Sequence, residues 1–388
     1  MITKRYLMSF NFATFHLISK LNLFPFVFDS TRGILSAQRN KLRVWIYKFH
    51  VLLSALLLVY KCFRLIQSAV DPAMFEVTSF CIYITIFPLL FLMCVEAIMF
   101  VRQDTELMFL VSQNIIGKLT IINNARSIRN PWLKLTTNEI IVISLPLNIW
   151  NCYMRMFAMM ILSSRSSFSI FVMLPLKSSI ICLISTVVEL TILIPIFAAG
   201  FIGAYQGLNF PCRISEDLLG ALESKMGKQS SAQDVEVLCK SICHDLVKVI
   251  LEIQIQNATF SVMNYVIKIT FLFMSIFGMF VGIRYFSTMP ILASCSFFCS
   301  VYVTLIFVLV YGHMYTAADK IRSLKGLLLE ASKNCIDMTG RSYIKKLATG
   351  IPVVGIKTCF YDLDKTTTPN YLQYVINQVM SLLLTIKP

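Results

Sequence analysis

The sequence predicts an all-α, polytopic membrane protein with seven transmembrane helices, a cytoplasmic N-terminus and an extracellular C-terminus. The chain of 388 residues is 57% hydrophobic and 14% charged, with a mean hydropathy of +0.72. A soluble domain is usually about 45–50% apolar and about 25% charged. Several apolar stretches also reach the roughly 20 residues that a helix needs to cross about 30 Å of hydrocarbon.

The predicted spans divide the basic residues unequally between the two sides of the membrane. The spans are 44–67, 77–101, 138–163, 168–205, 259–283, 286–318 and 363–386. Most of the 35 Lys and Arg residues lie in the N-terminal arm and after the second, fourth and sixth spans. The intervals after the first, third and fifth spans, counted with the adjoining span ends, and the C-terminal tail hold only six basic residues: Lys61, Arg64, Arg165, Lys177, Arg284 and Lys387. Because basic residues near span ends stay cytoplasmic, the N-terminus is predicted inside and Pro388 outside.

The first elements are an amphipathic cytoplasmic arm, residues 1–43, and a short first span. Pro25 and Gly33 interrupt the arm. The uncharged core of the first span covers only residues 51–60. It reaches full length if Lys48 and Lys61 extend toward opposite interfaces.

The three long intervals on the predicted cytoplasmic side have apolar residues at helical spacing. These residues are Leu107, Leu110, Val111, Ile115, Leu119 and Ile122, then Val235, Leu238, Ile242, Leu246, Val249 and Ile253, then Ile321, Leu324, Leu327, Leu328 and Ala331. Such helices either lie on the membrane surface or extend the spans and pack together as an anchor domain, and we favour packing. The second span is expected to continue directly into its interval, and Ser215 to cap a helix.

We find no internal repeat or low-complexity tract, so residues 1–388 are predicted to form a single domain. It comprises the arm (1–43), spans one to six with their extensions (44–318), a cytoplasmic helical segment (319–362) and the seventh span (363–388). The net charge of +15 is assigned to loops facing anionic membrane lipid rather than to nucleic-acid binding.

No motif of enzymatic chemistry is found in the sequence. Only four His are present, without paired carboxylates, a phosphate-binding glycine loop or a nucleophile motif. The chain is therefore predicted not to be an enzyme and to need no cofactor or metal, since Cys239, Cys243 and His244 lack a second pair of metal ligands. Whether Cys62 and Cys81 form a disulfide stays open.

The seventh span contains a polar stripe. Asn377, Ser381 and Thr385 recur every fourth residue and share one helix face. A polar stripe on a span faces protein or water, so it either lines a pore or makes interhelical hydrogen bonds. Leu382 and Ile386 adjoin the stripe, and apolar rings can gate a pore by dewetting. The predicted pore residues are Asn377, Gln378, Ser381, Leu382, Thr385 and Ile386.

The outer halves of spans two to six are the predicted ligand site. Aromatic side chains with a few polar groups suit a small organic ligand, although core packing is the alternative at each position. The candidates are Tyr83, Thr85, Trp150, Asn151, Tyr153, Arg155, Ser178, Glu189 and Ser294. Arg155 and Glu189 are intramembrane charges and hence functional candidates; the alternative is that each simply pairs with a neighbouring residue, and Lys268 on the fifth span is one possible partner of Glu189.

Two stretches resemble the insect chemoreceptor superfamily, the gustatory-receptor branch in particular. They are residues 23–33 (LFPFVFDSTRG), before the first span, and residues 355–364 (GIKTCFYDLD), leading into the last span. Gustatory receptors usually end in Thr-Tyr, five apolar residues and Gln-Phe, and this ending is absent here. The chain is accordingly similar to a divergent gustatory or odorant-receptor-like member.

The resemblance implies a chemosensory, ligand-gated, non-selective cation channel in the plasma membrane of sensory neurons. It implies a tetramer, homomeric or heteromeric with a co-receptor, with the seventh helices lining the pore. A small tastant or odorant would bind in the outer half of each subunit. A metabotropic seven-span receptor is an alternative, but it requires an outer N-terminus. A secondary transporter is another, but it predicts repeated halves with broken helices.

Overall fold

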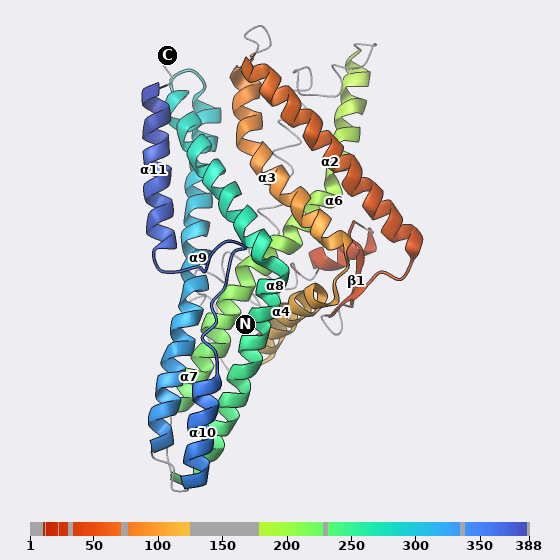
Figure 1. The fold of residues 1–388 in the computed structure, drawn as a ribbon. Coiled ribbons are helices and arrows are strands. Elements are labelled where there is room, and N and C mark those ends of the chain that lie inside the picture. The colour runs from red at the N-terminus through yellow and green to blue at the C-terminus, as the bar shows by residue number, and fades with distance from the viewer. Residues whose placement is uncertain are drawn as a thin grey trace. The chain divides into compact units, whose positions relative to one another are not determined.

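The computed structural model describes residues 11, 13–21, 23–29, 34–70, 77–124, 178–227, 232–333 and 338–385, which are mostly helical (Figure 1). They form two compact units. Unit 1 takes its residues from 1–206, 266–306 and 371–388, and unit 2 from 207–265 and 307–370. The long helices α8 (Ala232–Arg284) and α9 (Pro290–Lys333) contribute to both units.

Unit 1 begins with a helical segment and a β-hairpin. Strand β1 (Phe26–Asp29) pairs antiparallel with β2 (Ile34–Ala37). Phe26 and Phe28 are buried and Val27 is exposed, as expected for side chains that alternate between two faces. The all-α prediction missed this hairpin because each strand has only four residues.

Helices α2 (Lys41–Val70), α3 (Val77–Val101) and α6 (Ser179–Cys212) form much of the described core of unit 1. Asn40 caps α2, because its side-chain oxygen accepts the Leu42 N–H at 3.0 Å. Two buried hydroxyls of α2 tie it to its neighbours. The Tyr47 hydroxyl donates to the Ala97 carbonyl of α3 at 3.1 Å, and Ser54 Oγ donates to the Ile192 carbonyl of α6 at 2.6 Å.

The chain bends between α3 and α4 (Thr105–Asn124). The two helix axes differ by 116°, so the prediction that the second span runs straight on is wrong. Gln103 lies between the helices with a φ of 54°, outside the helical region. Its side-chain amide donates to the Pro25 carbonyl at 2.5 Å, which holds the bend against the hairpin. The predicted helix itself is present.

Close packing joins α8 and α9 within unit 1. A side chain on Gly282 would place its Cβ 2.6 Å from Phe297 Cβ, and one on Gly278 would place it 2.8 Å from Ser300 Cβ. Small residues four apart let two membrane helices approach closely. The last helix, α11 (Thr367–Thr385), also belongs mainly to unit 1.

Unit 2 contains the helical extensions. It includes the π-helix η5 (Arg213–Leu219), α7 (Gly220–Gly227), α10 (Met338–Gly350) and parts of α8 and α9, which run side by side in Figure 1. Most predicted stripe positions on α8 and α9 are buried, with Ile242, Leu246, Ile321 and Leu324 each 0% exposed, whereas Leu327 is 38% exposed. The predicted faces of these two helices therefore pack over most of their length.

The predicted cap at Ser215 is wrong. Helix α6 runs without a break into η5, so Ser215 lies inside a continuous helical segment where no helix starts. Its carbonyl instead accepts the Lys320 ammonium of α9 at 2.6 Å. Arg213 of the same segment pairs with Glu252 of α8.

Among the described residues, four helical segments are long and apolar enough to cross a membrane, which supports a multi-pass membrane protein. They are Lys41–Ser68, Ser179–Met226, Val235–Arg284 and Pro290–Lys333. The bent pair of α3 and α4 makes a fifth if it is one span. The third predicted span, 138–163, lies outside the described residues. Seven spans and the orientation therefore stay predictions, as do the single domain and the cytoplasmic side of unit 2.

Candidate functional site

The start of α11 is fixed by Asp364. The Thr366 N–H and hydroxyl donate to Asp364 Oδ1 at 3.0 and 2.7 Å, and the Asp364 N–H donates to Thr367 Oγ1 at 3.3 Å. This reciprocal pattern is that of a helix N-cap. The Leu-Asp end of the stretch 355–364 thus determines where the last helix begins.

Helix α11 has one packed face and one exposed face. Tyr371, Val375 and Val379 are buried. Asn377, Ser381 and Thr385, three of the predicted pore residues, are exposed together, as their spacing predicts.

The other predicted pore residues lie differently. Gln378 is half-buried, and Leu382 packs against the buried cluster of Cys81, Phe280 and Val281. Ile386 lies outside the described residues. In the single chain, the polar stripe is therefore exposed while the adjoining leucine contacts α3 and α8.

Three buried hydroxyls connect α11 to α8 and α9. Ser275 Oγ lies 2.8 Å from the Tyr371 hydroxyl and 2.8 Å from Thr304 Oγ1. Thr304 in turn donates to the Ser300 carbonyl at 2.8 Å. Hydrogen bonds in a buried network strengthen one another, so this triad holds the first turns of α11. This triad was not predicted from the sequence, although each of its residues is a polar position within an apolar helix.

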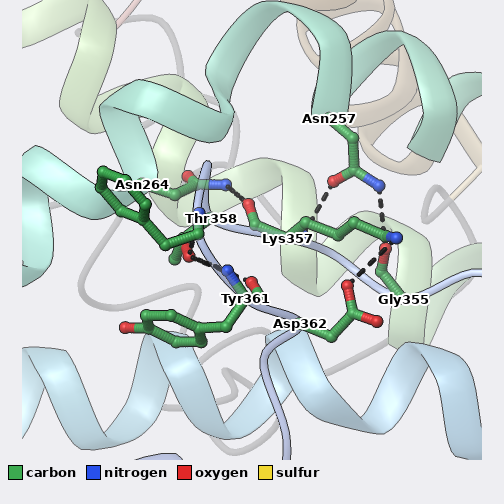
Figure 2. Close-up of polar contacts among 8 residues, drawn as sticks. Asn257, Asn264, Gly355, Lys357, Thr358, Tyr361 and Asp362 are labelled. Carbon is green, nitrogen blue, oxygen red and sulfur yellow. Dashed lines mark hydrogen bonds and ion pairs between the residues drawn. The ribbon is translucent and has the colours of Figure 1, made fainter.

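Residues 351–366, which we call the strap, connect α10 to α11 in unit 2. Figure 2 shows the Asn257 amide bonded twice to the strap: it donates to the Gly355 carbonyl and accepts the Lys357 N–H, both at 2.9 Å. Asn264 donates to the Lys357 carbonyl at 2.9 Å. The two asparagine side chains thus form hydrogen bonds with the strap's backbone of the kind that a neighbouring β-strand would form.

The rest of the strap is also held by polar contacts. The Ser261 carbonyl accepts the Cys359 N–H at 3.1 Å, and Asn257, Ser261 and Asn264 share one face of α8. The strap folds locally too, since the Thr358 N–H donates to the Tyr361 carbonyl at 2.9 Å (Figure 2).

Two ion pairs accompany the strap. Lys357 pairs with Asp362 at 3.1 Å. At the end of the strap, the Lys365 ammonium lies 2.9 Å from Asp319 Oδ2 on the extension of α9. This hydrogen bond lowers the pKa of the Asp319 carboxyl. Both pairs are exposed and contribute little stability.

Two predicted ligand residues, Tyr83 and Glu189, meet around a third side chain. The Lys61 ammonium lies 2.8 Å from Glu189 Oε2 and 5.0 Å from the centre of the Tyr83 ring. The Lys61 and Glu189 side chains are 2% and 1% exposed. The ion-pair partner of Glu189 is thus Lys61 rather than Lys268, because α2 packs against α6 and buries Lys61 beside the carboxylate.

The remaining ligand candidates do not join this cluster in the described structure. Ser178 is exposed, and its Oγ accepts the Ile181 N–H at 3.3 Å at the start of α6. Ser294 is half-buried on α9. The Thr85 side chain lies outside the described residues, as do Trp150, Asn151, Tyr153 and Arg155.

The cysteines in the described part of the chain form no disulfide and no metal cluster. Cys62 and Cys81 are not joined by a disulfide. Cys239 and Cys243 are buried in α8, as small apolar-like residues often are. No group of His, Cys, Asp and Glu among the described residues could hold a metal ion.

No protein-family model and no curated protein sequence matches the chain. Solved structures do match. The insect olfactory receptor OR5 from Machilis hrabei in complex with eugenol superposes with a TM-score of 0.65 and 14% identity, covering 99% of each chain. The chain has the insect olfactory receptor fold. A second structure of that receptor gives a TM-score of 0.63 and 13% identity, covering 98% of this chain and 99% of the other.

The insect olfactory receptor fold confirms the predicted resemblance to the chemoreceptor superfamily at the level of the fold and over nearly the whole chain. Both matched structures are of one olfactory receptor, which agrees with the prediction that this chain is not an enzyme. Membership of the gustatory branch stays a prediction.

Proposed function

We propose that the chain is a subunit of a chemosensory, ligand-gated, non-selective cation channel. The exposed polar stripe of α11 is the observation that carries this proposal. Asn377, Ser381 and Thr385 face away from the packed side of the helix. Because a polar stripe on a span faces water or protein, seven-span copies arranged around an axis would turn it into a pore wall.

The chemistry of the stripe fits weakly selective conduction. Amide and hydroxyl groups line it, and no acidic residue follows Asp364 in the sequence. Rings of acidic side chains are one means of selecting cations, and this helix lacks such a ring. We propose a tetramer, homomeric or formed with a co-receptor, in the plasma membrane of sensory neurons.

The ligand we propose is a small organic molecule of odorant or tastant size. One receptor with the same fold has been solved with eugenol. The cluster of Lys61, Tyr83 and Glu189 joins an aromatic ring to charged groups in the predicted outer half of the membrane, the combination expected of a binding site.

Whole-cell recording tests the channel function. The full chain is expressed alone and with a co-receptor, and exposed to odorants and tastants while G-protein signalling is blocked. A ligand-evoked cation current that persists under the block supports the proposal. A response that the block abolishes points to a metabotropic receptor.

Cysteine substitution tests the pore wall in the same recordings. Ser381→Cys and Asn377→Cys are expected to make the current sensitive to a water-soluble, positively charged thiol reagent. Val379→Cys, on the buried face, is the matched control and should resemble the parent chain. Equal sensitivity of all three variants would contradict the assignment.

A further inference from the structure

A buried cation site lies between α2, α3 and α6 in unit 1. The Glu189 carboxylate and the face of Tyr83 surround the Lys61 ammonium, at 2.8 Å from the oxygen and 5.0 Å from the ring centre. Carboxylates and aromatic faces are the two groups that attract ammonium ions most effectively in proteins. The arrangement is therefore a site for an ammonium group, which the chain's own lysine fills.

A second polar group on α6, the Ser185 hydroxyl, lies close to Glu189 along the helix. It lies one helical turn before Glu189 and is 7% exposed. Its hydroxyl has no hydrogen-bond partner among the residues that the structure describes. The spacing of four residues places it on the same face of α6 as Glu189. A buried hydroxyl without a partner is unfavourable, and a ligand atom could supply that partner.

We propose that Glu189, Tyr83 and Ser185 bind the amino group of a small organic amine, and that Lys61 occupies this site when the ligand is absent. The inference rests on the proposed function only in that the amine would be the activating ligand. Beyond its Cα atom, a lysine side chain is itself a butylammonium group. The space that Lys61 leaves on withdrawing therefore matches n-butylamine.

The exchange conserves charge in the site. The amine enters as a neutral base and its nitrogen takes one proton from the Lys61 ammonium. The new alkylammonium pairs with Glu189, and Lys61 is left as a neutral amine. Primary amines have similar basicity, so this transfer is nearly balanced. It avoids an unpaired carboxylate or a second buried cation, both of which are costly in a low-dielectric interior.

Thermal unfolding of the purified full chain in detergent tests the site with n-butylamine as probe and n-butanol as neutral control. Lys61→Ala removes the butylammonium group and leaves its space empty beside Glu189. We expect n-butylamine to raise the unfolding midpoint of Lys61→Ala, saturably and at least tenfold more potently than n-butanol. The double variant Lys61→Ala with Glu189→Gln, which leaves no charge at this ion pair, should lose this difference.

Each outcome decides the proposal. Recovery of folded Lys61→Ala only when n-butylamine is present supports it. A folded Lys61→Ala that responds equally to amine and alcohol overturns the proposal. The proposal is also overturned if Lys61→Ala stays unfolded in n-butylamine although the double variant folds. The unfolding assay does not depend on channel activity. Amine stabilisation would therefore uphold the site even if the whole-cell recordings found no ligand-evoked current, a result that would refute only the channel.

Discussion

Replacing Asn257 by leucine would release the strap from α8. Leucine has a similar size but cannot bond to the Gly355 carbonyl or the Lys357 N–H, each 2.9 Å from the asparagine amide. The Gly355 carbonyl is partly buried, whereas water reaches the Lys357 N–H. Losing the bond to the carbonyl therefore costs more stability than losing the bond to the N–H. With about 1 kcal/mol for a typical net hydrogen bond and about 1–3 kcal/mol for a buried group left unpaired, the total is about 2 kcal/mol.

Amide hydrogen exchange of the purified chain measures this loss directly. About 2 kcal/mol corresponds to roughly thirtyfold more frequent opening, since about 1.4 kcal/mol is a factor of ten. Residues 355–359 of Asn257→Leu should exchange faster by about that factor, while the buried stripe around Ile321 stays protected. Asn257→Asp keeps the acceptor for Lys357 and loses only the donor, so its effect should be intermediate.

Unchanged protection of residues 355–359 in Asn257→Leu would refute the role of this asparagine. Asn257 also begins the sequence Asn-Ala-Thr, a glycosylation acceptor. The Asn257 amide nitrogen already donates a hydrogen bond to the Gly355 carbonyl, and the predicted orientation places Asn257 inside the cell. A glycopeptide containing Asn257 would contradict both the bonded strap and the orientation.

Three further substitutions test the helix contacts. Gly282→Leu should force α8 and α9 apart at Phe297 and cost about 1–3 kcal/mol of stability. Gly282→Ala should lower the thermal unfolding midpoint less than Gly282→Leu does. Equal midpoints for the two variants would count against the close approach of the helices. Asp364→Ala should cost about 1 kcal/mol of stability by removing the cap of α11, whereas Asp364→Asn should retain most of the capping stability. The loss is measured as faster amide exchange at Thr366 and Thr367. Equal exchange in the two variants would rule out the cap. Asn377→Asp should place a carboxylate at each subunit's pore wall and increase cation over anion permeability, measured by reversal potentials in diluted salt, and an unaltered reversal potential would argue against a pore position.

Helix positions were predictable from the sequence where an apolar run and a helix coincide. The second span, 77–101, matches α3 at both ends. The apolar stripe before the fifth span was predicted to extend that span, and both belong to the single helix α8. Hydropathy detects the part of a helix that contacts lipid, whereas the helix itself continues wherever its stripe finds packing partners.

Contacts between distant segments were not predictable. Glu189 was recognised from the sequence as an energetically unfavourable charge within the membrane, but its partner Lys61 lies 128 positions away along the chain. Choosing between Lys61 and Lys268 requires the relative depth of three helices, which spacing along the chain does not give. The bend at Gln103 was missed for a related reason, since the Pro25 carbonyl that stabilises it is 78 positions distant.

The contacts that anchor α11 are made by other residues than those of its polar face. The Asp364 cap sets the start of the helix, and the Tyr371 hydroxyl fixes its first turns to Ser275. Neither contact involves Asn377 or Ser381, which remain exposed. The stretch 355–364 that resembles the superfamily therefore builds the attachment of the helix and not its stripe. The attachment of α11 therefore does not depend on the Thr-Tyr and Gln-Phe ending of gustatory receptors, which this chain lacks while having the insect olfactory receptor fold.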